Sequence, residues 1–381
     1  MLLWATSKTF GGPLSPLNQT TAQDEIEVAV FGPGLGEAIL IHCGNGQWIC
    51  VDCAADDGVC WPLQYLQQMG LDPNECVRLI VATHWHADHV NRLSELLSQC
   101  SRAQFVCSAA LRADEFKQIV ARFSYKETGA ARSPLAEVLK SFELLATKKR
   151  NRDASYKAPI FASAHHILDN FTAHGRPITV MALSPSAQDV LNALEAFAEY
   201  FVPIEQPVTG LSPIAQNHAS VVVSVQIGQE VLLLLGGDLQ KTSSHLTGWN
   251  AVIASTLRPQ ELSAFFKVPH HGSTNAQSDD VWQRMLVPSV HAAVTQFVGS
   301  GLPTRQQQQW LCSKSPFVFA TGLPSNSNIR RRREVEKTIR ESTRKFASRR
   351  LPRRPAVVRF RKTSQDGAWR VETFGEARRL T

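Results

Sequence analysis

The feature that most constrains this chain is a run of metal-binding side chains at residues 84–89, with the sequence HWHADH. The run follows a largely apolar segment, Val77 to Thr83, which predicts a buried strand. Residues 89–100 then show the apolar spacing of a helix. The pattern therefore predicts a strand, a short loop and a helix. The loop would direct four ligand-type side chains toward one point, namely His84, His86, Asp88 and His89.

These side chains have the chemistry of a metal site. Neutral imidazoles and carboxylates suit Zn²⁺, Mn²⁺ or iron. An aspartate buried among histidines would be costly without a cation to pair with it. The alternative is a surface loop rich in histidine, but the density of ligands at the end of a strand favours the metal site.

The H-x-H-x-D-H pattern after an apolar strand resembles the signature of the metallo-β-lactamase superfamily, and residues that match its other motifs follow in order. Asp52 matches the first motif, in which an aspartate orients a ligand loop from behind the ligands. The third, fourth and fifth motifs are matched by His218, Asp238 and His270. The resemblance implies one ion on His84, His86 and His218, a second on Asp88, His89 and His270, and Asp238 bridging both. His166 is an alternative to His218.

Within the superfamily, the chain most resembles the hydrolase domain of the competence DNA-uptake protein ComEC and its stand-alone relatives, over about residues 27–325. The likeness rests on the block from Asn217 to Asp238 and on VPHHGS at 268–273. The chain departs from it at His86, where ComEC-like domains often carry aspartate, and in the turn GLGE at 34–37, where they have G-Q-G-D. Stand-alone members resemble components of prokaryotic defence systems, which implies protein partners from a multi-gene system.

Two residue identities narrow the expected reaction. Position 86 is histidine, not the glutamate of diiron oxygen-reducing members, so hydrolysis is favoured over redox chemistry. Position 238 is aspartate, not the cysteine ligand of β-lactam-cleaving members. The implied cofactors are two divalent ions, Zn²⁺ or Mn²⁺, which would share and activate a water molecule.

Asp88 and His271 are the predicted catalytic residues. His271 follows the expected ligand His270 and is a candidate to protonate the leaving alkoxide of a phosphodiester. A structural role, in packing or in supporting the ligands, is equally open for His271 because adjacency alone does not place its ring.

The distribution of apolar segments predicts an α+β fold. An early strand-rich part has candidate strands at 27–32, 37–43 and 47–52, and a later one lies between 220 and 321. Helical spacing is found near 111–124, 134–148, 187–200 and 241–255. Two strand-rich halves with helices between and after them predict an αββα sandwich with a helical insertion at about 110–200. The expected organisation is an N-terminal arm (1–26), a metallo-β-lactamase-fold domain (27–325) and a basic C-terminal extension (326–381).

The positive charge of the chain is concentrated at its C-terminal end. The net charge is +7, but residues 330–381 hold 18 Lys and Arg against 6 Asp and Glu. This composition is expected of a protein that meets a polyanion. The candidate nucleic-acid-binding residues are Arg330, Arg331, Arg332, Arg333, Arg349 and Arg350, on a basic helix followed by a hairpin. A solvated helix face, or a surface for an acidic partner, is the alternative.

Together these features predict a metal-dependent phosphodiesterase or nuclease that acts on DNA, RNA or a nucleotide. A hydrolase of a small ester, thioester or lactam is one alternative, and a non-catalytic binding subunit of a complex is another. No run of eighteen apolar residues and no signal-like start is present, so we expect a cytoplasmic protein without membrane contact. The eight cysteines lie mostly in apolar segments, so we expect buried thiols.

Overall fold

Along the strands near the start of the chain, successive side chains point alternately into two apolar layers. In the computed structural model, β1 (Ile26–Phe31) turns Ala29 and Phe31 toward outer helices and Val28 and Val30 toward a second sheet. Side chains of a strand point alternately to its two faces, so a strand buried on both sides is apolar at every position. The structure describes residues 19–32, 36–53, 55–56, 59–112, 134–198, 213–229, 231–324, 356–363 and 367–381.

The first sheet has eight strands, with antiparallel pairing from β17 to β3 and parallel pairing from β3 to β8. Its order is β17 (Arg370–Phe374), β16 (Val357–Lys362), β1, β2 (Ala38–His42), β3 (Trp48–Val51), β6 (Val77–Ala82), β7 (Gln104–Ser108) and β8 (Ile160–Ala162). A small separate hairpin pairs β4 (Ala55–Asp56) with β5 (Val59–Cys60).

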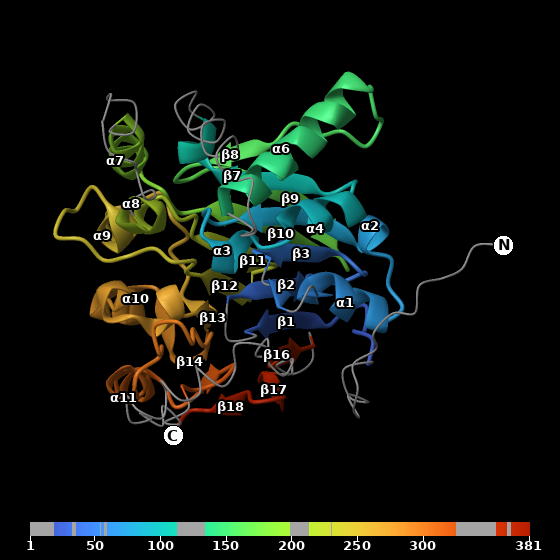
Figure 1. Cartoon of the computed structure of the whole chain (residues 1–381). Coiled ribbons are helices and arrows are strands. Elements are labelled where there is room, and N and C mark those ends of the chain that lie inside the picture. Colours follow the sequence, from blue (N-terminus) through green and yellow to red (C-terminus); the bar gives the residue numbers. More distant parts are fainter. Residues whose placement is uncertain are drawn as a thin grey trace, which may run out of the picture.

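The second sheet also has eight strands, and its middle is parallel. Its order is β18 (Arg378–Arg379), β15 (Val318–Ala320), β14 (Leu286–Val294), β13 (Ser263–Lys267), β12 (Val231–Leu235), β11 (Val223–Ile227), β10 (Arg176–Ala182) and β9 (Ile167–Ala173). Figure 1 shows the two sheets stacked. At one end, β16 and β17 extend the first sheet and β18 extends the second.

Helices cover the outer face of each sheet. The first sheet is covered by α1 (Trp61–Gln68), α4 (Leu93–Gln99) and α6 (Pro134–Arg150), and the second by α9 (Gly248–Ala254), α10 (Asp279–Arg284) and α11 (Arg305–Lys314). Buried side chains form three layers, one between the sheets and one under each set of helices. The architecture is therefore the αββα sandwich predicted from the sequence. The other helices are α2 (Pro73–Cys76), α3 (Ala87–Val90), α7 (Ala187–Ala198), α8 (Pro213–His218) and the 3₁₀ turns η2 (Ala109–Arg112), η3 (His270–Gly272) and η4 (Thr274–Ala276).

The segment at 110–200, expected to be helical, contains three strands as well. β8 ends the first sheet, while β9 and β10 end the second. The apolar pattern of β9 is weak. This strand lies at the edge of the second sheet, and Asn170 and Thr172 are exposed on one of its faces. Helices α6 and α7 are where helical spacing predicted them, while the predicted helix near 111–124 lies outside the described residues apart from its first two positions.

Two further helices differ from the expectation. The helix predicted at 89–100 is divided into α3 and α4 by Arg92, whose backbone is left-handed with φ of 67°. The helix predicted near 241–255 is shorter, because Thr242 and Thr247 hydrogen-bond to each other in a turn before α9 begins. The cysteines are free thiols, and all except the half-buried Cys312 are buried.

The last strands of the chain belong to the sandwich itself. The predicted hairpin is present as β16 and β17, and β16 pairs with β1 along its whole length. Arg361 of β16 donates to Glu27 of β1 over 2.7 Å, and both side chains are buried. The basic helix predicted at 330–350 lies outside the described residues. Within the described ranges, no helix combines the length and the apolar character needed to cross a bilayer.

Candidate metal centre

The candidate ligands lie where strands of both sheets end. In each sheet the relevant strands are parallel neighbours, β3 with β6 and β12 with β13, so their carboxyl ends lie at the same edge. The loops that follow these four strands contribute Asp52, His84, Asp238 and His271. The N–H of Val221 donates to the carbonyl of Thr83 over 2.9 Å and joins the sheets behind the site.

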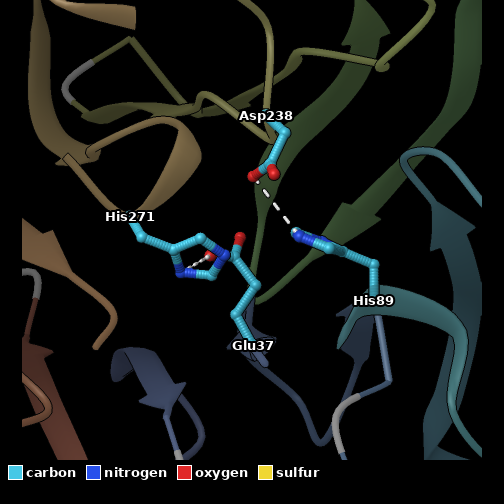
Figure 2. A group of neighbouring side chains, drawn as sticks. All are labelled: Glu37, His89, Asp238 and His271. Atoms are coloured by element: carbon cyan, nitrogen blue, oxygen red, sulfur yellow. Dashed lines mark ion pairs between the residues drawn. The ribbon is translucent and has the colours of Figure 1, made fainter. Parts of the chain in front are cut away.

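Two groups of ligand atoms share one aspartate. In each group the ligand-capable atoms lie within 4.8 Å of one another, and the groups are Glu37, His89, Asp238 and His271, and His84, His86 and Asp238. Oδ1 of Asp238 is 3.3 Å from Nε2 of His89, and its Oδ2 is 3.7 Å from Nε2 of His84. Figure 2 shows the first group, with its side chains converging from four segments. A shared carboxylate between two ligand groups is the arrangement that a dinuclear centre needs.

Asp52 determines which nitrogen of two histidines faces the centre. Its Oδ2 accepts from Nδ1–H of His89 at 2.7 Å and from the hydroxyl of Thr83 at 2.8 Å. Because that hydroxyl gives its one proton to Asp52, it accepts from Nδ1–H of His84 at 3.0 Å. Both imidazoles therefore direct Nε2 into the centre, as metal-binding histidines do when their other nitrogen is hydrogen-bonded.

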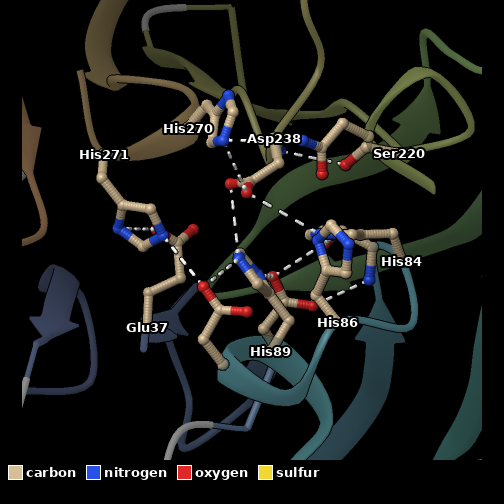
Figure 3. Close-up of polar contacts among 12 residues, drawn as sticks. Glu37, His84, His86, His89, Ser220, Asp238, His270 and His271 are labelled. Atoms are coloured by element: carbon tan, nitrogen blue, oxygen red, sulfur yellow. Dashed lines mark hydrogen bonds and ion pairs between the residues drawn. The ribbon is translucent and has the colours of Figure 1, made fainter. Parts of the chain in front are cut away.

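Thr295 orients His271 in the same way. The Thr295 hydroxyl donates to Oε2 of Glu37 at 2.7 Å, so it accepts from Nδ1–H of His271 at 2.9 Å. Nε2 of His271 then points at Oδ2 of Asp88, 3.1 Å away. Figure 3 shows His271 beside Glu37, on one side of the group of histidines around Asp238.

Acceptors therefore face one another across the centre. Nε2 of His271 faces Asp88, and Nε2 of His89 lies between Asp88 and Asp238 at 3.7 and 3.3 Å. The buried atoms Nε2 of His89, Oδ1 of Asp238 and Oε1 of Glu37 have no hydrogen-bond partner among the described residues. Only a proton or a metal cation between such atoms relieves their repulsion. The residues present thus fit a bound cation.

The electrostatics of the centre favour positive charge. Although burial alone would lower it, the carboxylates of Asp238, Asp52 and Asp88 hold the pKa of His89 well above its usual value. Burial alone would raise the pKa of Asp88, but His89 and His271 hold it below its ordinary range. The carboxylates thus draw a proton to His89, the position that a metal ion would compete for.

Burial keeps the other imidazoles neutral. It lowers the pKa of His84 far below the ordinary value, and it lowers the pKa of His86 and of His270 as well. Metal binding requires the unprotonated form of each ligand. These three histidines are therefore ready to bind at neutral pH, whereas His89 has a proton to release.

The structure brings most of the predicted site residues together. His84, His86, Asp88, His89 and Asp238 surround one centre, with Asp52 behind them. His270 is more peripheral, since its Nε2 is 3.9 Å from Oδ2 of Asp238, and amide side chains of Asn217, Gln240 and Asn275 lie around its ring. His271, predicted as a proton donor, instead presents an unprotonated nitrogen among the ligands.

The structure does not bring His218 or its alternative, His166, into either ligand group of the described residues. His218 is the last residue of α8. The preceding residue, Asn217, is the one that approaches the centre, with Nδ2 3.5 Å from Nε2 of His270. His166 is exposed in the turn before β9. Arg330–Arg333, Arg349 and Arg350 lie outside the described residues.

Three residues at the centre were not predicted as site residues: Glu37, Lys267 and Thr295. A signal for Lys267 was available, because a lysine inside the apolar strand sequence SAFFKV is costly to bury without a carboxylate partner. Gly36 lets Glu37 reach the site, since a Cβ at Gly36 would lie 2.2 Å from the carbonyl oxygen of Asp88. That carbonyl accepts the N–H of Glu37 at 3.0 Å.

Comparison with known proteins gives distant similarities. No family model matches the sequence, and no curated protein matches it. The metallo-β-lactamase SMB-1 bound to 2-mercaptoethanesulfonate is similar over 77% of this chain and 86% of its own, with 15% identity and a TM-score of 0.32. A β-lactamase domain protein from Burkholderia ambifaria is similar over 67% of this chain and 61% of its own, with 11% identity and a TM-score of 0.29.

A flavodiiron protein from Giardia intestinalis is similar over 56% of this chain and 36% of its own, with 12% identity and a TM-score of 0.26. These scores are low. The assignment of the αββα sandwich comes from the strand order and apolar layers of this chain itself.

Proposed function

We propose that this protein is a metal-dependent hydrolase that uses two divalent ions, Zn²⁺ or Mn²⁺, to cleave phosphodiester bonds of a nucleic acid or nucleotide. The observation that carries the proposal is the convergence of imidazole nitrogens on Asp238 from two groups of ligands. Two ions held there would supply an activated water molecule as nucleophile and would stabilise the negative charge that develops on phosphorus oxygens.

The residues of this chain have separate tasks in the proposed reaction. His84 and His86 would hold one ion and His89 and His271 the other, and Asp238 belongs to both groups of ligands. Asp88, whose side chain is 16% exposed, lies at the open side of the second group and can orient the attacking water by accepting its proton. Asp52 and Thr83 keep the imidazoles in the binding tautomer throughout.

Two features support a phosphodiester as the substrate. The amide nitrogens of Asn217 and Gln240 lie beside His270 at the edge of the centre, where N–H groups can donate to phosphate oxygens. The second feature is the excess of Lys and Arg in residues 330–381, which would attract a polyanion and make binding weaken as salt increases.

The cellular role that we propose follows from the resemblance to ComEC-like hydrolases. We include in the proposal a role in prokaryotic antiviral defence, in the cytoplasm, with partner proteins from the same multi-gene system. Plaque formation by phage in cells that carry the gene and its neighbours tests this role. Protection that persists in an Asp238→Asn strain would contradict it.

The direct test is cleavage of labelled DNA and RNA, single- and double-stranded, and of cyclic dinucleotides, by the full chain with Zn²⁺, Mn²⁺ or chelator. We expect metal-dependent cleavage that is lost in Asp88→Asn. A matched control is Asp169→Asn, which removes a carboxylate that pairs with Arg78 at 3.3 Å away from the ligand groups. Hydrolysis of p-nitrophenyl esters with intact nucleic acid would instead indicate a small-ester hydrolase. No hydrolysis of any substrate would favour a binding subunit.

A further inference from the structure

A buried ion pair adjoins the centre and is not used by the reaction proposed above. Nζ of Lys267 donates to Oε2 of Glu37 over 2.6 Å and to the carbonyl of Val268 over 2.8 Å. Both charged side chains have 0% exposure. Glu37 precedes β2 of the first sheet and Lys267 ends β13 of the second, so the pair joins the sheets beside the ligands.

The two oxygens of the Glu37 carboxylate have different surroundings. Oε2 accepts from Lys267 at 2.6 Å and from the Thr295 hydroxyl at 2.7 Å. Oε1 is buried and has no hydrogen-bond partner. Figure 2 shows this carboxylate directed into the space between His271, His89 and Asp238. A ligand-capable atom of Glu37 lies within 4.8 Å of such atoms of all three residues.

A buried carboxylate oxygen without a donor is costly, and native proteins satisfy such atoms almost always. The donors nearest to Glu37 are already committed to Oε2, so they do not relieve Oε1. The surrounding side chains are a carboxylate and two imidazoles, a set that suits Zn²⁺ or Mn²⁺. A cation therefore satisfies Oε1 where no N–H or O–H group of the described residues does.

We propose that Glu37 is a direct ligand of the ion held by His89 and His271, through Oε1. This assignment rests on the metal centre of the proposed function and adds a ligand to it. Lys267 and Thr295 are positioning residues that hold Oε2, and Thr295 couples the carboxylate to the orientation of His271. One carboxylate thereby binds the ion and fixes a second ligand.

The experiment measures metal binding without any substrate. Full-length protein is loaded with Zn²⁺, dialysed and analysed for bound zinc, and the affinity is measured by competition with a chromophoric chelator. We expect two zinc ions in the wild-type protein. In Glu37→Gln we expect one of the two to bind at least about tenfold more weakly, the lower end of what loss of a supporting residue costs a metal site. Co²⁺-loaded protein gives a second readout, because loss of a carboxylate ligand changes the visible absorption spectrum.

Glu37→Gln leaves the Lys267 ammonium buried without its partner, which by itself can prevent folding. The double variant Glu37→Gln/Lys267→Met removes both charges and keeps their volumes, and it is expected to show the same loss of one ion. Glu27→Gln is the matched control, because Glu27 is a buried carboxylate paired with Arg361 away from the ligand groups. It should retain two zinc ions at wild-type affinity.

The outcomes separate this inference from the proposed function. If Glu37→Gln and the double variant bind two ions as tightly as the wild type, Glu37 is not a ligand, and the hydrolase proposal stands. If the wild-type protein binds no divalent ion, the metal centre fails and both proposals fail with it. Selective weakening of one ion in both Glu37 variants, with an altered Co²⁺ spectrum, supports the assignment.

Discussion

The Nδ1–H group of His89 donates to Oδ2 of Asp52 over 2.7 Å, and this contact decides that Nε2 of His89 faces Asp238. Asp52 also accepts the N–H and the hydroxyl of Thr83, at the start of the loop that carries the other ligands. The left-handed backbone of Asp52, with φ of 62°, turns its side chain toward that loop. One carboxylate thus orders the ligand loop without belonging to either ligand group.

Replacement of Asp52 by Asn should weaken metal binding without removing a ligand. An amide has one oxygen, so it cannot accept the Nδ1–H of His89 and the Thr83 hydroxyl at one atom and the Thr83 N–H at the other, as the carboxylate does. The tautomers of His84 and His89 are then no longer enforced. We expect a loss of about 10- to 100-fold in affinity for Zn²⁺, measured by chelator competition. Asp72→Asn, which alters an exposed helix cap, is the control. Unchanged affinity in Asp52→Asn would show that the tautomers are set by other contacts.

Metal binding should release a proton from His89. The pKa of His89 is raised well above 6.5 by Asp238, Asp52 and Asp88, so at pH 7 this imidazole holds a proton that a metal must displace. Affinity for Zn²⁺ should therefore rise with pH across the neutral range. Calorimetry in buffers with different ionisation enthalpies measures the number of protons released at pH 7. A value of zero would contradict the proton assignment.

The stability of the fold should decrease in mild acid because of His42. Its Nδ1–H donates to the carbonyl of Glu25 and its Nε2 accepts the N–H of Gly46, and burial lowers its pKa to about 4. The unfolded chain takes up this proton near pH 6.5, so folding stability falls between about pH 6.5 and 4, by about 3 kcal/mol in total.

Urea unfolding at several pH values measures this slope, which should be smaller in His42→Gln. His174→Gln is the matched control, since His174 is exposed in the turn before β10. An identical slope in wild type and His42→Gln would assign the acid sensitivity to other groups.

Arg361 should contribute strongly to stability although it lies in the basic C-terminal part of the chain. Its side chain is 3% exposed and donates to Glu27, which is 0% exposed, so Arg361→Met leaves a buried carboxylate unpaired. We expect a loss of about 3–5 kcal/mol in the free energy of unfolding, measured with urea. Arg370→Met is the control, because Arg370 is 61% exposed and its pair with Glu25 should contribute about 1 kcal/mol or less. Equal effects of the two variants would argue that β16 is not an integral strand.

The sequence by itself determined the local parts of the site. The apolar segment β6 followed by HWHADH predicts four ligand-type side chains on one loop, because spacing along a strand–loop–helix unit depends on local geometry. Asp52 and Asp238 could be predicted for the same reason, since each follows an apolar strand. The αββα class followed from two strand-rich halves that need helices to cover them.

Only the tertiary structure decided how distant segments meet. His271 rather than His270 enters a ligand group because the backbone after β13 turns through positive φ angles at both residues, 48° and 53°, which no spacing rule foresees. Asn217 instead of His218 approaches the centre because α8 directs the two side chains differently. The edge strand β9 and its neighbour β10 were missed because a strand exposed on one face needs few apolar residues.

The remaining differences between the sequence-based prediction and the structure come from contacts between segments far apart in the sequence. Glu37 and Lys267 are ordinary charged residues in the sequence, and only the stacking of two sheets brings them together in a buried pair. The pairing of β16 with β1 likewise joins the two ends of the chain, and it turns Arg359 and Arg361 from part of a basic segment into buried parts of the sandwich. Local patterns determine which face of a strand is buried, whereas the partner that covers it depends on contacts between segments far apart in the sequence.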